Sequence, residues 1–98
     1  MDELIKRLDE YMDTHIGVLD ESETDSKWKN VRWLDCNDEE GKKLYTDLWD
    51  NLFIGSEWNY DNKAQFQKAG YSCIATDKDS FGILVAVIAK GDKAISLG

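Results

Sequence analysis

The stretch from 81 to 89, Phe-Gly-Ile-Leu-Val-Ala-Val-Ile-Ala, constrains the fold more than any other part of this chain. Its residues from 83 to 89 are all apolar and several are β-branched, which is typical of a strand covered on both faces. Polar turn signals flank the run at 77–80 and 90–93. The pattern therefore predicts three antiparallel strands at 71–76, 81–89 and 94–97, with 81–89 in the centre.

Helical periodicity dominates the first half of the chain. Apolar residues at helical spacing predict one helix over 2–16, ended by Gly17, and a second over 38–54, capped by Asn37 or Asp38 and ended by Gly55. The two apolar stripes are Leu4, Ile5, Leu8, Tyr11, Met12 and Ile16 in the first helix, and Leu44, Tyr45, Leu48, Trp49, Leu52 and Phe53 in the second.

Three further segments complete the expected architecture. Residues 61–69 predict a short helix, capped by Asp61 and ended by Gly70, with Ala64, Phe66 and Ala69 as its buried contacts. Residues 19–26 form a polar loop, and 28–36 fit neither period, which favours a short strand or an extended segment. The pattern as a whole predicts one α+β domain over 1–98, with N-terminal helices packed on a C-terminal three-stranded antiparallel meander.

The cysteines and the N-terminus bear on the compartment. Cys36 and Cys73 are too few for the disulfide framework that small secreted domains usually carry. The opening Met-Asp-Glu-Leu-Ile-Lys lacks the basic region and apolar run of a signal peptide, and the longest apolar stretch is too short to span a bilayer. We therefore expect a cytoplasmic protein.

A search for catalytic and metal-binding motifs finds none. No phosphate-binding loop, dinucleotide fingerprint or nucleophile elbow occurs, and the EF-hand-like starts at Asp35 and Asp77 fail at required ligand positions. His15, the only histidine, is interpreted as a partly buried or capping residue at the end of the first helix. Cys73 is interpreted as a small core residue. We accordingly expect no enzyme activity, no cofactor and no metal.

Acidic residues are concentrated in the first two thirds of the chain. The formal net charge is −8, and residues 1–61 hold 17 acidic and 7 basic residues, whereas residues 62–98 hold 3 and 5. Nucleic acids and anionic membranes repel such a chain, so neither is expected as a direct partner. No Lys or Arg lies between Leu8 and Ser26, where seven acids fall: Asp9, Glu10, Asp13, Asp20, Glu21, Glu23 and Asp25.

These acids have two interpretations. One is a solvated face that keeps a small protein soluble. The other is a surface for a basic partner. In an extended segment the alternating acids of 21–25 would point the same way, about 6.6 Å apart. Asp9, Glu10 and Asp13 would lie about 5–6 Å from one another on the first helix. Both spacings are comparable with those of phosphates along a nucleic-acid strand.

Four aromatic residues add to the candidate surface. Trp28, Trp33, Trp58 and Tyr60 lie in segments without a clean amphipathic period. Trp and Tyr are the residues that most often anchor protein interfaces. The alternative is that each of them covers the edge of a small core.

In size, charge and expected architecture the chain is similar to small acidic inhibitors encoded by phages and mobile elements. These include anti-restriction and anti-CRISPR proteins, the uracil-DNA glycosylase inhibitor and toxin-immunity proteins. The likeness includes no motif, so it carries over no residue. The favoured hypothesis is a non-catalytic nucleic-acid mimic that inhibits a basic, nucleic-acid-handling partner, such as a nuclease. The alternatives are an adaptor subunit that docks through apolar helix faces, and a small enzyme with an unrecognised site.

Overall fold

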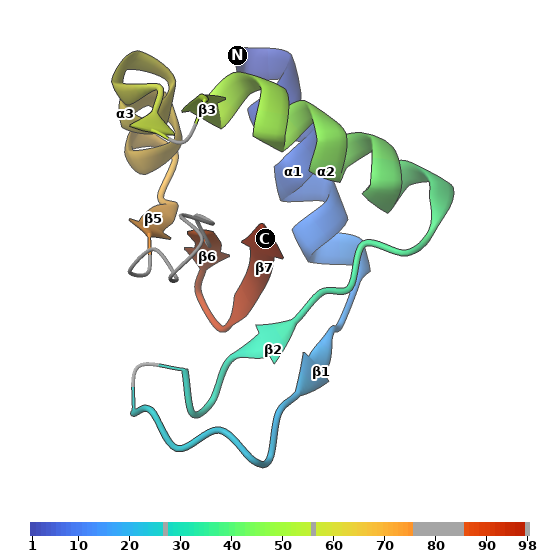
Figure 1. Cartoon of the computed structure of the whole chain (residues 1–98). Helices are drawn as coiled ribbons and strands as arrows, with labels where there is room; N and C mark the ends of the chain where they lie inside the picture. The colour runs from blue at the N-terminus through green and yellow to red at the C-terminus, as the bar shows by residue number, and fades with distance from the viewer. Residues whose placement is uncertain (27, 56, 76–85, 98) are drawn as a thin grey trace.

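The computed structural model describes residues 1–26, 28–55, 57–75 and 86–97 of the chain. It is an α+β structure in which three helices lie on one face of a sheet, as Figure 1 shows. The helices are α1 (Asp2–Thr14), α2 (Glu39–Leu52) and α3 (Tyr60–Lys68). The strands are β1 (Val18–Leu19), β2 (Arg32–Trp33), β3 (Phe53–Ile54), β4 (Glu57–Trp58), β5 (Ser72–Ala75), β6 (Ala86–Lys90) and β7 (Lys93–Leu97).

The main sheet has five strands in the order β1-β2-β7-β6-β5. Strands β5, β6 and β7 pair antiparallel in sequence order, which confirms the predicted meander as its C-terminal part. The prediction of a three-stranded sheet under purely N-terminal helices is wrong, because β1 and β2 precede α2 and extend the sheet. Strand β2 runs parallel to β7, where Arg32 N donates to Asp92 O at 2.7 Å and Leu34 N to Ala94 O at 2.9 Å.

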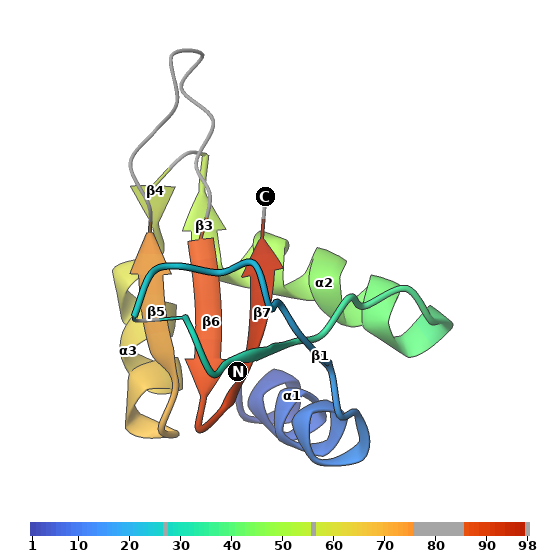
Figure 2. The same cartoon turned by 90° about the horizontal axis from the view of Figure 1, so that it is seen from below.

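Strand β6 is covered on both faces, as its apolar sequence predicts. Ala86 and Ile88 belong to the core under the helices, whereas Val87, which points the other way, is also buried. Figure 2 shows the segments 20–26 and 28–31 crossing the face of the sheet opposite the helices. Strand β6 lies between β5 and β7, so it is not an edge strand. Residues 81–85 of the predicted strand, and the predicted turn at 77–80, lie outside the described residues.

Helix α1 is shorter than predicted. It ends at Thr14, because His15 adopts an extended conformation with φ −119° and ψ 133°. Ile16, predicted on the apolar stripe, is therefore 72% exposed, and Gly17 lies beyond the helix end rather than stopping it. Leu4, Leu8, Tyr11 and Met12 form the buried face of α1, and Ile5 packs at its margin.

Helix α2 begins as predicted and ends two residues early. The side chain of Asp38 accepts a hydrogen bond from Gly41 N, which confirms Asp38 as the N-cap. After Leu52 the backbone becomes extended, and residues 53–54 (β3) pair with residues 57–58 (β4) in a two-stranded hairpin. The sequence pattern did not predict this hairpin. Gly55, with φ +64°, sits in the turn of this hairpin instead of capping a helix.

Helix α3 begins one residue earlier than predicted. Its N-cap is Asn59, whose side chain accepts from Asn62 N, and not Asp61. Phe66 is fully buried, Ala69 packs against the core at its edge, and Ala64 is exposed, contrary to expectation. Asn62 also donates to Asn51 O at 2.6 Å, which joins α3 to α2.

The core lies between the helices and the sheet. Leu8, Leu44, Leu48, Leu52, Phe66, Ile88, Ile95 and Leu97 are its largest fully buried side chains. The two predicted helix stripes thus face inward, apart from Ile16, with Tyr45 and Trp49 packed at the margin of the core. Within the described residues, no helix is both long enough and apolar enough to cross a membrane.

Candidate protein-binding surface

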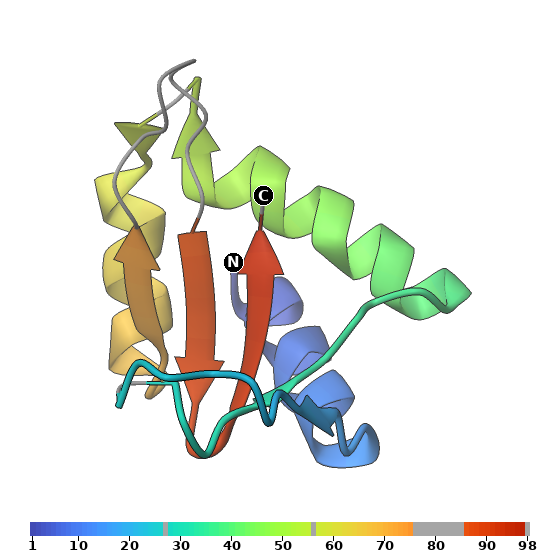
Figure 3. The ribbon, with the colours of Figure 1, turned by 60° about the horizontal axis from the view of Figure 1, so that its bottom comes forward.

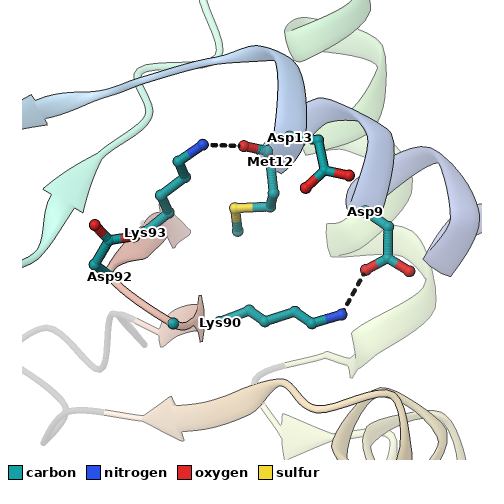
Figure 4. Close-up of a pocket in the computed structure, with 7 residues that line it drawn as sticks. Asp9, Met12, Asp13, Lys90, Asp92 and Lys93 are labelled. Atoms are coloured by element: carbon teal, nitrogen blue, oxygen red, sulfur yellow. Dashed lines mark hydrogen bonds and ion pairs between the residues drawn. The ribbon is translucent and has the colours of Figure 1, made fainter.

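The predicted acidic face is divided by the fold into separate regions. Asp9 and Asp13 of α1 point toward the β6–β7 hairpin, where they line a cleft with Lys90, Asp92 and Lys93 (Figure 4). The Lys90 ammonium lies 3.0 Å from Asp9 Oδ1, and Lys93 Nζ donates to Met12 O near the end of α1. Asp9 therefore pairs with a base of the same chain, 81 residues further along the sequence, and Asp13 lines the same cleft.

Asp9 is held by a second donor from the sheet side. The Tyr71 hydroxyl donates to Asp9 Oδ1 at 2.5 Å. Partial burial opposes ionisation, but the Tyr71 hydrogen bond and the Lys90 ammonium outweigh it and lower the pKa of Asp9. Burial and the neighbouring Asp9 carboxylate raise the pKa of Tyr71. Asp9 thus has a role in joining α1 to the sheet, which the sequence pattern did not reveal.

Glu10 lies on a different side of α1 from Asp9 and Asp13. It lines a shallow hollow with Arg7, His15 and Glu40, between α1 and α2. Arg7 forms ion pairs there with two acids of α2, at 3.3 Å to Glu40 and 2.8 Å to Asp47. The three predicted helix acids consequently do not make one outward-facing row.

The loop acids also depart from the expected row. Glu23 N donates to Asp20 O at 3.2 Å, so the chain turns here rather than continuing as a strand. Asp20 Oδ1 accepts from Ser22 N and Ser22 Oγ, and Glu23 Oε1 accepts from Asp25 N. These bonds fix Asp20 and Glu23 locally, and the regular 6.6 Å spacing of an extended strand does not apply to this loop.

The structure instead gathers acids around β1 and β2. A hollow of about 660 Å³, here named the β1 hollow, lies where the loop after β1 meets the end of β2. It is lined by Val18, Leu19, Asp20, Glu21, Ser22, Trp33 and Asp35. Three of these side chains are carboxylates and three are large and apolar. Among the described residues, no Lys or Arg lines this hollow, in contrast with the cleft beside Asp9.

The apolar wall of the β1 hollow is unusually exposed for this chain. Val18 is 71% and Leu19 37% exposed, and Ile16 continues the apolar surface toward α1. A smaller hollow on the same side is lined by Ile16, Val18, Trp33 and Asp35 together with residues of α1, so the two depressions adjoin. Together they form a surface with an apolar centre and an acidic rim, the arrangement common at protein interfaces.

The predicted aromatic residues fall into two groups. Trp28 and Trp33 are half-buried with ring centroids 5.6 Å apart, and Trp33 lines the β1 hollow. Trp58 belongs to the hairpin β3–β4, stacks on Phe53 at 4.8 Å and packs against the core. Tyr60 is 69% exposed at the start of α3. The aromatic set is thus split, and only its first group joins acids of the candidate surface.

Sequence reasoning missed three contributors to this surface. Val18 was unassigned, Leu19 was placed in the predicted polar loop although it belongs to strand β1, and Asp35 was placed in an extended segment without a role. Val18 and Leu19 follow Gly17 directly in the sequence, and their exposure is shown by the structure. The proximity of Asp35 to Asp20 and Glu21 depends on the pairing of β1 with β2, with Val18 opposite Trp33.

The ionisable side chains near His15 form a structural junction. His15 Nε2 lies 2.8 Å from Asp38 Oδ2, and its ring stacks on Tyr11 at 3.7 Å between centroids. His15 is half-buried at the helix end, as the sequence predicted. Cys36 nearby has φ +55° and is buried, and burial raises its pKa to about 11. Such a thiol is a poor nucleophile at neutral pH.

Cys73 is buried as predicted, and burial raises its pKa to about 11. Among the described side chains, no group of three or more His, Cys, Asp or Glu is placed to hold a metal ion.

Comparisons with known proteins do not assign the chain. No protein-family model, curated protein sequence or solved structure matches it. The functional conclusion therefore depends on the surfaces described above.

Proposed function

We propose that this protein is a non-catalytic binding protein that occupies the basic surface of a nucleic-acid-handling partner and so inhibits it. The observation that carries the proposal is the β1 hollow, where three carboxylates surround exposed apolar side chains without a described Lys or Arg among them. Like-charge repulsion disfavours an acidic partner here, and a basic one is attracted over long range.

The fold favours this proposal over docking through apolar helix faces. The apolar stripes of α1 and α2 include Leu8, Leu44 and Leu48, and each of these side chains is fully buried in the chain's own core. The larger exposed apolar side chains of the described residues lie mainly outside the helices: Ile16, Val18, Leu19, Ile54 and Tyr60. Three of these five, Ile16, Val18 and Leu19, lie at or beside the β1 hollow, so a partner would meet this surface before any helix stripe.

The test compares two variants with equal changes of charge. The first, Asp20→Asn with Glu21→Gln and Asp35→Asn, neutralises the β1 hollow. The matched control, Asp50→Asn with Glu57→Gln and Asp61→Asn, neutralises three exposed acids on α2, β4 and α3. Each variant changes two Asp and one Glu, so net charge and composition stay matched. Asp35 Oδ1 and Asp20 Oδ1 accept local hydrogen bonds, which an Asn side chain can also accept.

The partner is first isolated from the native host at low salt, with the wild-type chain as bait, and then purified. We expect a basic protein whose affinity for the chain falls steeply with added salt, mainly through a slower association rate. The hollow variant should bind at least about 10-fold more weakly and lose much of the salt dependence, whereas the control should stay within about 2-fold of wild type. The chain should also compete with DNA or RNA for the partner. Equal binding by both variants, or no competition, would contradict the proposal.

A further inference from the structure

The outer edge of β1 is open for pairing. β1 is the terminal strand of the five-stranded sheet, and it pairs with β2 on one side only within the described residues. In Figure 3, β1 lies apart from the β5–β7 strands, beside the end of α1. An edge strand presents backbone N–H and C=O groups to which an extended segment of another chain can add. The adjacent β1 hollow supplies what such a segment would also need, a pocket for a side chain.

The β1 hollow combines two surfaces that one kind of side chain satisfies together. Val18, Leu19 and Trp33 offer an apolar wall, and the three acids lie around it. Arginine and lysine have apolar stems and a cationic head, so each can lay its stem on the wall and its head among the acids. The planar guanidinium of arginine has the further advantages that it stacks on an indole ring and binds carboxylates in a bidentate manner.

A second copy of this chain is a poorer occupant of the same edge. A second copy would bring its own hollow, with the same three carboxylates, to this edge, so two acidic hollows would lie in one interface. Like charges brought together in an interface are destabilising. A basic segment from a different protein meets no such repulsion. Charge complementarity thus selects a basic occupant over a symmetric dimer.

We propose that an extended, arginine-bearing segment of the partner adds to the outer edge of β1 as a further strand and places one arginine side chain in the β1 hollow. This inference rests on the proposed function, which it deepens by naming the recognised chemistry. The guanidinium lies among Asp20, Glu21 and Asp35, and its stem lies against Trp33. Alternate residues of the segment face away, because side chains of a strand alternate between its two sides.

The direct test uses synthetic peptides with the full chain. The probe is the peptide acetyl-Val-Thr-Arg-Thr-Val-amide. Its binding is monitored by two-dimensional NMR of the ¹⁵N-labelled protein. The expected result is saturable shifts at the Val18 and Leu19 amides and at the Trp33 indole N–H. Replacing arginine by citrulline, which keeps the shape but removes the charge, should weaken binding at least about 10-fold. Lysine should bind less tightly than arginine. A peptide N-methylated at its central amides, which cannot pair with an edge, should lose binding by at least about 10-fold.

Two protein variants complete the test. Trp33→Ala should remove binding, whereas Gln67→Ala, on the exposed side of α3, should leave it unchanged. Because Trp33 is half-buried and Trp33→Ala can disturb the fold, Glu21→Lys on the exposed loop serves as the second variant. Glu21→Lys should weaken binding of the arginine peptide at least about 10-fold, while its circular dichroism spectrum stays that of wild type.

Specific results would overturn the inference. Citrulline binding as tightly as arginine, N-methylation without effect, or shifts confined to residues away from β1 would each contradict it. Self-association that Glu21→Lys strengthens, with no peptide binding, would identify the edge as a contact between copies. If the peptides fail but the purified partner still loses affinity for the neutralised hollow, only the docking mode is wrong. If the neutralised hollow binds the partner normally, the proposed function fails as well.

Discussion

The His15 imidazole and the Asp38 carboxylate lie 2.8 Å apart, Nε2 to Oδ2, and join the end of α1 to the beginning of α2. Asp38 is also the N-cap of α2, where its Oδ1 accepts from Gly41 N at 2.6 Å and from the Tyr11 hydroxyl at 3.2 Å. One carboxylate therefore fixes a helix start, a helix end and a buried tyrosine. Four predictions follow from this junction and from the core beneath it.

Acid should weaken the fold partly through Asp38. The Gly41 N–H and then the His15 imidazole lower the pKa of Asp38 below its usual value of 3.8. A lowered pKa contributes stability that is present above the unfolded value and is lost as pH falls through the folded value. The free energy of unfolding of wild type, measured by urea denaturation, should therefore fall below about pH 4. Asp38→Asn should be less stable at pH 7 and should show a smaller further loss at pH 3. Asp50→Asn, at an exposed position, serves as the control. If Asp38→Asn lost as much stability between pH 7 and pH 3 as wild type does, Asp38 would not be the source of this pH dependence.

Gly41→Ala should destabilise the protein although it lies in a helix. A Gly to Ala change in a helix usually stabilises by about 0.5–1 kcal/mol. At this position the added Cβ would lie 2.6 Å from Cys36 Cα and 2.5 Å from the Tyr11 hydroxyl oxygen. Overpacking of this kind costs about 1–3 kcal/mol. Urea melts should show that loss, with the exposed Lys43→Ala on the same helix nearly neutral. A more stable Gly41→Ala protein would show that α1 and α2 do not approach as described.

Leu48→Ala should cost about 2–5 kcal/mol of unfolding free energy, the usual range for a buried large-to-small change. Leu48 is fully buried in the same core cluster as Leu8 and Leu52. Chemical denaturation of the variant checks this, and Lys42→Ala, on the exposed side of α2, should change stability by less than about 0.5 kcal/mol. A loss for Leu48→Ala as small as that of the control would show that this stripe is not core.

The thiols should be unreactive in the folded protein. Burial raises the pKa of both Cys36 and Cys73 to about 11, so little thiolate forms at pH 8. Reaction with a disulfide reagent such as 5,5′-dithiobis(2-nitrobenzoate) should be slow in buffer and fast in denaturing urea, where both cysteines react and two thionitrobenzoate ions are released per chain. Rapid modification of either cysteine in the native protein would indicate an opening that the folded structure does not contain.

Local patterns in the sequence determined several elements directly. The apolar stripes of α1 and α2 repeat every three to four residues, so each helix and its buried face can be predicted without knowing its neighbours. The cap Asp38 and the covered strand β6 are local signals of the same kind. The errors at Ile16 and Phe53 concern helix ends. There the chain leaves the helix because His15 contacts Asp38 and because residues 53–54 pair with 57–58.

Only the tertiary structure decided which acids form a surface. Charge counts treat Asp9 and Asp20 alike, but Lys90, 81 residues further on, lies against Asp9 and not near the β1 hollow. The two-residue strands β1 and β2 carry no periodicity of their own. Their position depends on the parallel pairing of β2 with β7, which brings together segments about 60 residues apart in the sequence. Contacts over such separations leave no repeating pattern in the chain, because the free energy that forms them comes from pairing and burial with a distant segment.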